Sequence, residues 1–286
     1  MDAYLDYARR GRNQWWRYVL TLVLAVVLAL AVGTGLMFAM ILAGANPVVL
    51  SSELTSARNP IDFFAANGVL FAIMAVSLVV FARLIQGKRI GDLVGRADWR
   101  WFARGFGVWL AIAIVGTGID YLLAPGGFRL TVSAGTWALG AAAAIGLFAQ
   151  TFAEELYFRG FLTQGLLLAT RRPVVAALLS GLLFGAAHIP NGAPQAVGAV
   201  CFGIASAYIA IRTGGIACTL GIHFANNLFG AVVVVSGQDV FKGAPGVLTQ
   251  NTPTLMWWDV GVELVSVALV TFLLVRSAAA KAPRPA

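Results

Sequence analysis

Charge is scarce in this sequence of 286 residues. Only 11% of the residues are charged, 59% are hydrophobic, and the mean hydropathy is +0.83. Charges spread this thinly cannot keep a globule of this size in solution, which excludes an ordinary soluble domain and indicates a membrane protein. Cysteine is almost absent: Cys201 and Cys218 fit no metal-site or redox spacing, so we interpret both as small apolar core residues.

Long apolar runs fill most of the chain. A helix needs about 20 apolar residues to cross the hydrocarbon, and only helices or closed barrels satisfy their backbone groups there. The runs are continuous rather than alternating and therefore predict an all-α, polytopic membrane helical bundle. The eight predicted spans are approximately Tyr18–Ala45, Phe63–Ala82, Gly105–Ala124, Ala134–Ala153 with a helical continuation past Glu154, Val174–His188, Gln195–Ile211, Ile216–Val235 and Asp259–Val275.

The chain is predicted to be a single transmembrane domain over residues 1–286, with a disordered tail over 277–286. Basic residues favour the cytoplasmic side, and an even number of spans places both termini on one side. With the N-terminus inside, 17 of the 20 basic residues fall inside and only Arg58, Arg129 and Lys242 fall outside. We therefore expect both termini to be cytoplasmic.

The net charge is +8 at neutral pH, but this excess does not predict a nucleic-acid partner. The basic residues flank the spans instead of forming one patch with interleaved aromatics, so lipid headgroups explain them more simply. Arginine outnumbers lysine 17 to 3 and alanine and glycine are abundant, as in a bacterium with a GC-rich genome. We therefore expect a multi-pass protein of a bacterial inner membrane.

Against this apolar background, the segment "AEELYFRG" carries two adjacent carboxylates and an arginine. Glu155 and Arg159 are four residues apart, in the orientation that favours a helical ion pair. This pairing would neutralise Glu155. Glu154 is rotated by about 100° around the helix and is left as the carboxylate available to act as a base.

The two histidines of the chain, His188 and His223, both lie within or at the end of apolar spans. Asn227 follows His223 by four residues and shares its helical face, as Phe184 does for His188. Ionisable groups in the bilayer are costly, so each needs a reason. Each group alone is more often structural, but together the clusters on the fourth, fifth and seventh spans contain all the histidine of the protein.

If these spans converge, the side chains can hydrolyse an amide without a serine or cysteine nucleophile. A carboxylate and an imidazole can polarise water, while a second imidazole and an amide donate hydrogen bonds to an oxyanion. The same groups, Glu154, His188 and His223, could instead hold a zinc ion, although this set is one strong ligand short of a comfortable site. Both alternatives remain open at this point.

A non-enzymatic interpretation also remains. A transporter, or an immunity or scaffold protein that binds peptide in the same cavity, would depend more on Asp120 and Glu263, which the hydrolytic scheme leaves aside. The absence of an internal repeat weakens the transporter interpretation.

The motifs "EELYFR", "FGAAH" and "HFANN", in this order on separate helices, resemble those of the CPBP family of intramembrane proteases. That family comprises type II CAAX prenyl endopeptidases and their bacterial relatives, also called Abi or bacteriocin-processing proteins. The resemblance covers approximately residues 134–235 and marks this segment as a catalytic core.

The resemblance implies a role for each motif residue. Glu154 is the catalytic glutamate, helped by His188 to activate water, and His223 with Asn227 stabilises the oxyanion. The supporting residues are Glu155, Arg159 and Phe184. It further implies a cavity open to the cytoplasm, cleavage of a membrane-associated peptide or protein near that face, and either a metal-free glutamate mechanism or zinc; we favour the former.

Overall fold

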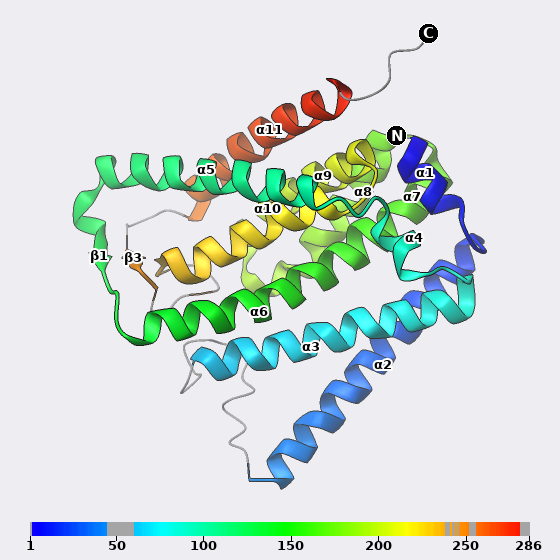
Figure 1. Cartoon of the computed structure of the whole chain (residues 1–286), viewed down its shortest axis with the longest axis horizontal. Coiled ribbons are helices and arrows are strands. Elements are labelled where there is room, and N and C mark those ends of the chain that lie inside the picture. Colours follow the sequence, from blue (N-terminus) through cyan, green and yellow to red (C-terminus); the bar gives the residue numbers. More distant parts are fainter. Residues whose placement is uncertain are drawn as a thin grey trace.

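The structure, a computed structural model, describes residues 2–44, 60–237, 241, 244, 246–251 and 256–280. It is a bundle of long helices (Figure 1). The principal helices are α2 (Trp15–Leu42), α3 (Pro60–Phe81), α5 (Trp99–Leu123), α6 (Gly135–Glu155), α8 (Pro173–Ala187), α9 (Ala193–Thr213), α10 (Ala217–Leu228) and α11 (Met256–Ala280). Three shorter helices, α1 (Asp2–Arg9), α4 (Ile90–Val94) and α7 (Thr163–Thr170), lie together at one end of the bundle, the end at which α11 finishes.

Eight apolar helices occur where the sequence predicts them, but two are too short to span a bilayer alone. Six, over 15–42, 60–86, 99–123, 135–170, 193–213 and 257–279, are long and apolar enough to cross. The other two cover 173–187 and 217–233. Fifteen residues rise only about 22 Å, less than the hydrocarbon thickness of about 30 Å. The prediction of eight full spans is therefore corrected to six, with two shorter helices packed among them.

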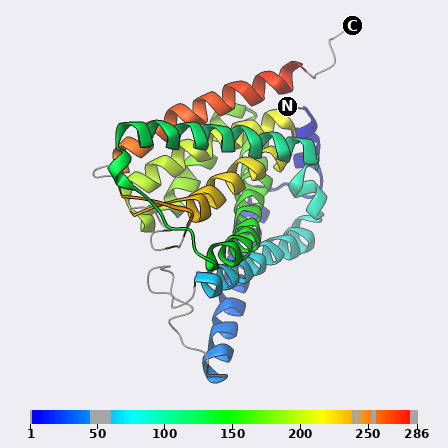
Figure 2. The ribbon, with the colours of Figure 1, turned by 60° about the vertical axis from the view of Figure 1, so that its left-hand side comes forward.

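Helix pairing places α6 at the centre. It packs against α3 on one side and α10 on the other, while α10 lies against α5, and α9 lies between α8 and α11. Figure 2 shows the same bundle from the side, with α2 diverging from the other helices towards its C-terminal end. Two of the three motif-bearing segments, α6 and α10, therefore lie at the centre of the bundle, and the third, α8, packs against α9.

A small sheet closes the end of the bundle opposite the termini. Strands β1 (Phe128–Leu130), β3 (Leu248–Gln250) and β2 (Val234–Ser236) lie in the order β1-β3-β2, with β3 antiparallel to β1 and parallel to β2. Arg129 pairs with Thr249, and Val235 pairs with Thr249 from the other side. The all-α prediction missed this sheet, because three-residue strands are too short to leave a periodic pattern.

At the opposite end, buried polar contacts fix α1 to the bundle. Tyr4 is fully buried and its hydroxyl donates to the carbonyl of Arg159. The ammonium of Lys88 is also buried and donates to the carbonyl of Ala8 at 2.8 Å. Burial lowers the pKa of Lys88 to about 8, so the group is still mostly charged at neutral pH and keeps its donor role. The N-terminal segment is thus part of the fold.

The predicted tail over 277–286 is in fact helical as far as Ala280, because α11 continues to that residue. The remainder of the tail, 281–286, lies outside the described residues. The predicted outer positions of Arg58 and Lys242 lie outside them too.

Close packing of α5 against α10 depends on glycine. A Cβ added to Gly105 would lie 2.1 Å from the carbonyl oxygen of Cys218, and one added to Gly221 would lie 2.2 Å from that of Phe102. Small residues at such crossings let helix backbones approach closely, which drives association inside a membrane. This contact holds α10, and therefore His223, against the core.

We predict that Gly105→Ala lowers the free energy of unfolding by about 1 to 3 kcal/mol, because the new methyl group displaces the α10 backbone. The matched control is Gly107→Ala on the same helix, where an added Cβ meets nothing within 4 Å. That change should be neutral or stabilise by up to about 1 kcal/mol. Thermal unfolding of both variants in detergent measures the difference, and equal effects would contradict the packing described here.

Candidate active site

The helix that carries Glu154 and Glu155 changes its winding directly after them. Residues Leu156–Leu162 form a π-helical turn that joins α6 to α7. Such turns are uncommon and often occur at functional sites. Hydroxyl groups satisfy its carbonyls: Thr163 donates to Phe158 O at 2.7 Å, and Tyr4 donates to Arg159 O. These bonds fix the turn that positions Arg159.

Glu155 and Arg159 form the ion pair that their spacing predicts. Arg159 Nη1 lies 3.0 Å from Glu155 Oε1, and both side chains are fully buried. The guanidinium also lies over the ring of Phe184, 4.3 Å from its centroid. Burying one of these charges without the other would be strongly unfavourable, so each requires the other.

His223 lies between the two carboxylates. Its Nδ1 is 3.0 Å from Glu155 Oε1, and its Nε2 is 3.5 Å from Glu154 Oε2. Glu155 is held as a carboxylate by Arg159 and therefore accepts, which places a proton on Nδ1 of His223. Nε2 consequently points toward Glu154. The sequence predicts neither contact, and the second role of Glu155, as the group that orients His223, is a finding of the structure.

Glu154 has a partner of its own. Gln150 Nε2 donates to Glu154 Oε1 at 3.0 Å, and Asn67 Nδ2 donates to Gln150 Oε1 at 2.8 Å. Glu154 is 9% exposed, and its Oε2 has no hydrogen bond within the described chain. The expectation of an unpaired Glu154 thus holds for one oxygen and is wrong for the other.

Gln150 and Asn67 are site residues that the sequence analysis missed. A signal existed for the first, because Gln150 lies four residues before Glu154 on the same helical face. Asn67 lies on a different span, α3, and its contact joins residues 83 positions apart in the sequence. No local spacing reveals such a contact.

His188 caps the C-terminal end of α8. Its Nδ1 lies 2.8 Å from the carbonyl oxygen of Phe184. A carbonyl only accepts, so Nδ1 carries the proton and the neutral ring offers Nε2 as an acceptor. The ring of Phe184 lies 4.4 Å from that of His188 and 5.9 Å from that of His223, measured between centroids. Phe184 therefore packs against both histidines and Arg159.

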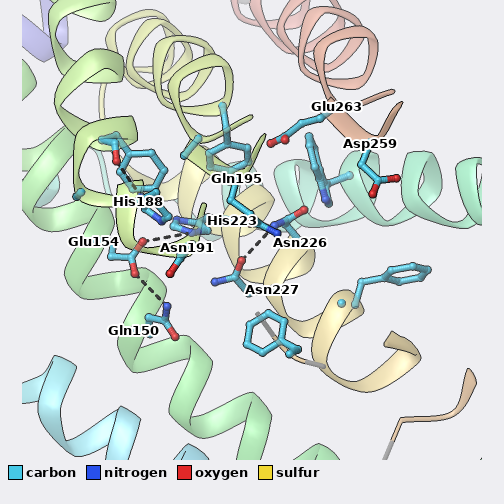
Figure 3. Close-up of a pocket in the computed structure, with 18 of the residues that line it drawn as sticks. Gln150, Glu154, His188, Asn191, Gln195, His223, Asn226, Asn227, Asp259 and Glu263 are labelled. Carbon is cyan, nitrogen blue, oxygen red and sulfur yellow. Dashed lines mark hydrogen bonds and ion pairs between the residues drawn. The ribbon is translucent and has the colours of Figure 1, made fainter. Parts of the chain in front are cut away.

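Asn227 lies one helical turn beyond His223 on α10 and accepts a hydrogen bond from Asn226 Nδ2 at 3.1 Å through its Oδ1. This bond leaves the amide N–H groups of Asn227 as the donors that it presents to the cavity. In Figure 3 the side chains of Glu154, His188, His223 and Asn227 face a common space.

That space is a cavity of about 990 Å³. Glu154, His188, His223 and Asn227 all line it, as does Phe184. Asp120 and Glu263, which the hydrolytic scheme leaves aside, line the same cavity. The side chains on which the two alternative functions depend therefore line the same cavity. Glu155 and Arg159 contact two of its lining residues, His223 and Phe184.

The donor set does not fit a zinc site. Within the described ranges, no group of three or more His, Cys, Asp and Glu residues is placed to hold a metal ion. Both ring nitrogens of His223 already face carboxylates, and Nδ1 of His188 is bonded to a carbonyl. The zinc alternative with Glu154, His188 and His223 as ligands is not supported, and no step is derived through a metal.

Comparison with known proteins matches residues 135–229 to the family described as Type II CAAX prenyl endopeptidase Rce1-like. The chain is also 30% identical over 274 residues to the uncharacterized protein YyaK of Bacillus subtilis, covering 89% of this chain and 91% of that protein. No solved structure gives a significant match. The matched segment contains all three motifs.

We predict that Arg159→Leu lowers the free energy of unfolding by about 3 to 5 kcal/mol, because it leaves Glu155 as a buried charge without its counterion. The double variant Glu155→Leu with Arg159→Leu should recover much of this loss. Arg212→Leu, at an exposed site in the last turn of α9, is the control and should stay within about 0.5 kcal/mol of the wild type. Chemical or thermal unfolding in detergent measures these losses. Equal losses of unfolding free energy in Arg159→Leu and Arg212→Leu would contradict this explanation.

Proposed function

Because the chain belongs to the Rce1-like type II CAAX prenyl endopeptidase family, we propose that it is an intramembrane endopeptidase of the bacterial plasma membrane. Its substrate is a membrane-associated peptide or protein, held in the cavity lined by the three motifs. The observation that carries the proposal is the convergence of Glu154, His188, His223 and Asn227 from three helices on this one cavity.

Glu154 acts as the general base. Its Oε2 makes no hydrogen bond among the described residues while Nε2 of His223, 3.5 Å away, carries no proton, so it can accept a proton from a water molecule that enters the cavity. Gln150 holds the other oxygen and fixes the carboxylate plane. The Nε2 atom of His188 is a second acceptor facing the same space and helps to orient the water.

His223 and Asn227 bind the oxyanion that forms when water attacks the carbonyl carbon of the substrate. The N–H groups of Asn227 are donors on the cavity wall. His223 can donate from Nε2 to the oxyanion when its ring carries both protons, with Nδ1–H held by the carboxylate of Glu155. The tetrahedral intermediate then collapses as the C–N bond breaks, and the proton taken up by Glu154 is passed to the leaving amine.

Arg159 balances this charge distribution. Without it, Glu155 and Glu154 would place two negative charges around one imidazole in a buried site. With Arg159 present, the charge of Glu155 is balanced while its carboxylate holds Nδ1 of His223. The ion pair between Glu155 and Arg159 thus orients His223, which binds the oxyanion.

We predict that Glu154→Gln lowers the cleavage rate by about 10² to 10⁴-fold, because the amide cannot accept the proton of water. His223→Ala should lower the rate by about 10² to 10³-fold through loss of oxyanion binding. Comparing the membrane proteomes of cells that carry the wild type or Glu154→Gln identifies the substrate as peptides truncated only in the former.

The matched control is Asp62→Asn, the same carboxylate-to-amide change at an exposed position in the first turn of α3. This variant should give the wild-type set of truncated peptides. If Glu154→Gln also gives that set, the peptidase assignment is wrong. A peptide-binding transporter or scaffold, which needs no base at residue 154, would then be the better interpretation.

A further inference from the structure

The N-terminal helix α1 lies against the helices behind the active site and packs on α4, α7 and α9. Tyr4 is fully buried in an apolar cluster that also contains Leu167 on α7, Ala176 on α8 and Ile211 on α9. The hydroxyl of Tyr4 extends from this cluster and donates to the carbonyl of Arg159. A residue near the start of the chain is thus bonded directly to the backbone of the buried ion pair.

The C-terminal end of α1 is fixed to the same region. Lys88 Nζ, which donates to the carbonyl of Ala8, also lies 3.4 Å from Gln164 Oε1. Gln164 comes two residues after the π-helical turn, and its amide donates to the carbonyl of Asp92 at 2.7 Å. The segment from Arg159 to Gln164 is therefore held by α1 directly at its start and through Lys88 at its end.

The winding of this segment explains why a hydroxyl from another helix matters at Arg159. In the π-helical turn, the carbonyl of Phe158 accepts from the backbone N–H of Thr163, five residues further on. Where five-residue bonding returns to four-residue bonding, the helix passes over one carbonyl, which then needs another donor. The carbonyl of Arg159 comes directly after that of Phe158, and the hydroxyl of Tyr4 donates to it. This bond stabilises the π-helical winding relative to a regular α-helix.

The guanidinium of Arg159 depends on that winding for its position. Among the described residues, none of its three nitrogens has a well-aligned hydrogen bond. It is held by the contact with Glu155 Oε1 at 3.0 Å and by the ring of Phe184 beneath it. Both are electrostatic attractions that depend mainly on distance. The backbone of the π-helical turn must therefore place the guanidinium within reach of Glu155.

We propose that Tyr4 is a positioning residue for the peptidase. It holds the carbonyl of Arg159, the π-helical turn then places the guanidinium beside Glu155, and Glu155 holds Nδ1 of His223. Tyr4 is not among the described residues that line the cavity, so it acts only through this series of contacts. It also lies outside the segment 135–229 matched to the family, so α1 adds a part of the active site that this segment lacks. The assignment rests on the proposed peptidase function and adds to it.

Tyr4→Phe tests the proposal, because it removes the hydroxyl and leaves the ring in its apolar cluster. The matched control is Tyr7→Phe, the same change on the same helix at a half-buried tyrosine whose ring lies beside Arg10. Full-length protein labelled with ¹⁵N at histidine is placed in lipid nanodiscs. Nitrogen NMR then gives the imidazole signals of His223 in the wild type and in both variants.

Tyr4→Phe should move the Nδ1 signal of His223, and Tyr7→Phe should leave it at the wild-type position. In a Glu155→Gln background, Tyr4→Phe should add no further shift, because the ion pair through which it acts is already lost. An unmoved signal in Tyr4→Phe would overturn the proposal. Equal shifts in the two tyrosine variants, or a full additional shift in the Glu155→Gln background, would overturn it as well.

Cleavage separates this proposal from the peptidase assignment. Cells that carry Tyr4→Phe should form the peptides that distinguish the wild type from Glu154→Gln about 10- to 100-fold more slowly than wild-type cells. Tyr7→Phe should form them at the wild-type rate. A wild-type rate in Tyr4→Phe would overturn the positioning role. If wild-type cells form no such peptides while the His223 signal still moves, the series of contacts is supported and the peptidase assignment is wrong.

Discussion

The buried ion pair between Glu155 and Arg159 is the contact on which the rest of the site depends. Two opposite charges can remain in the interior of a membrane bundle only while they neutralise each other. This pair has a second effect, because Glu155 also holds Nδ1 of His223 at 3.0 Å. An ion pair between the end of α6 and the π-helical turn that follows thereby fixes the orientation of a histidine on α10, and Nε2 of that histidine is turned toward Glu154.

Two further features of the fold maintain this geometry. The π-helical turn after Glu155 places Arg159, and hydroxyl groups from Thr163 and Tyr4 satisfy its carbonyls. The glycine contacts allow the α10 backbone to pack directly against α5, and His223 on the same helix contacts Glu155 at the end of α6. The glycine contacts therefore set the distance between α5 and α10, and the ion pair sets the orientation of the imidazole ring of His223.

Local spacing was enough to predict part of the site. Four-residue intervals correctly paired Glu155 with Arg159 and put Phe184 beside His188, because a helix fixes these relations. The contacts of His223 with the two glutamates, and of Asn67 with Gln150, join separate helices and left no local signal. The short strands and the burial of Tyr4 were missed for the same reason. The number of full spans was overestimated, because α8 and α10 are apolar but short, and apolar composition does not distinguish a bilayer-spanning helix from one packed among others.

Glu155 holds a proton on Nδ1 of His223 and thereby leaves Nε2 to face Glu154. The chain has only two histidines, so nitrogen NMR of protein labelled with ¹⁵N at histidine should show two imidazoles, assigned with the variant His188→Gln. We expect Nδ1 of His223 to be protonated in the wild type, and Glu155→Gln to change the chemical shift of that nitrogen. A neutral His223 with its proton on Nε2 would contradict the account.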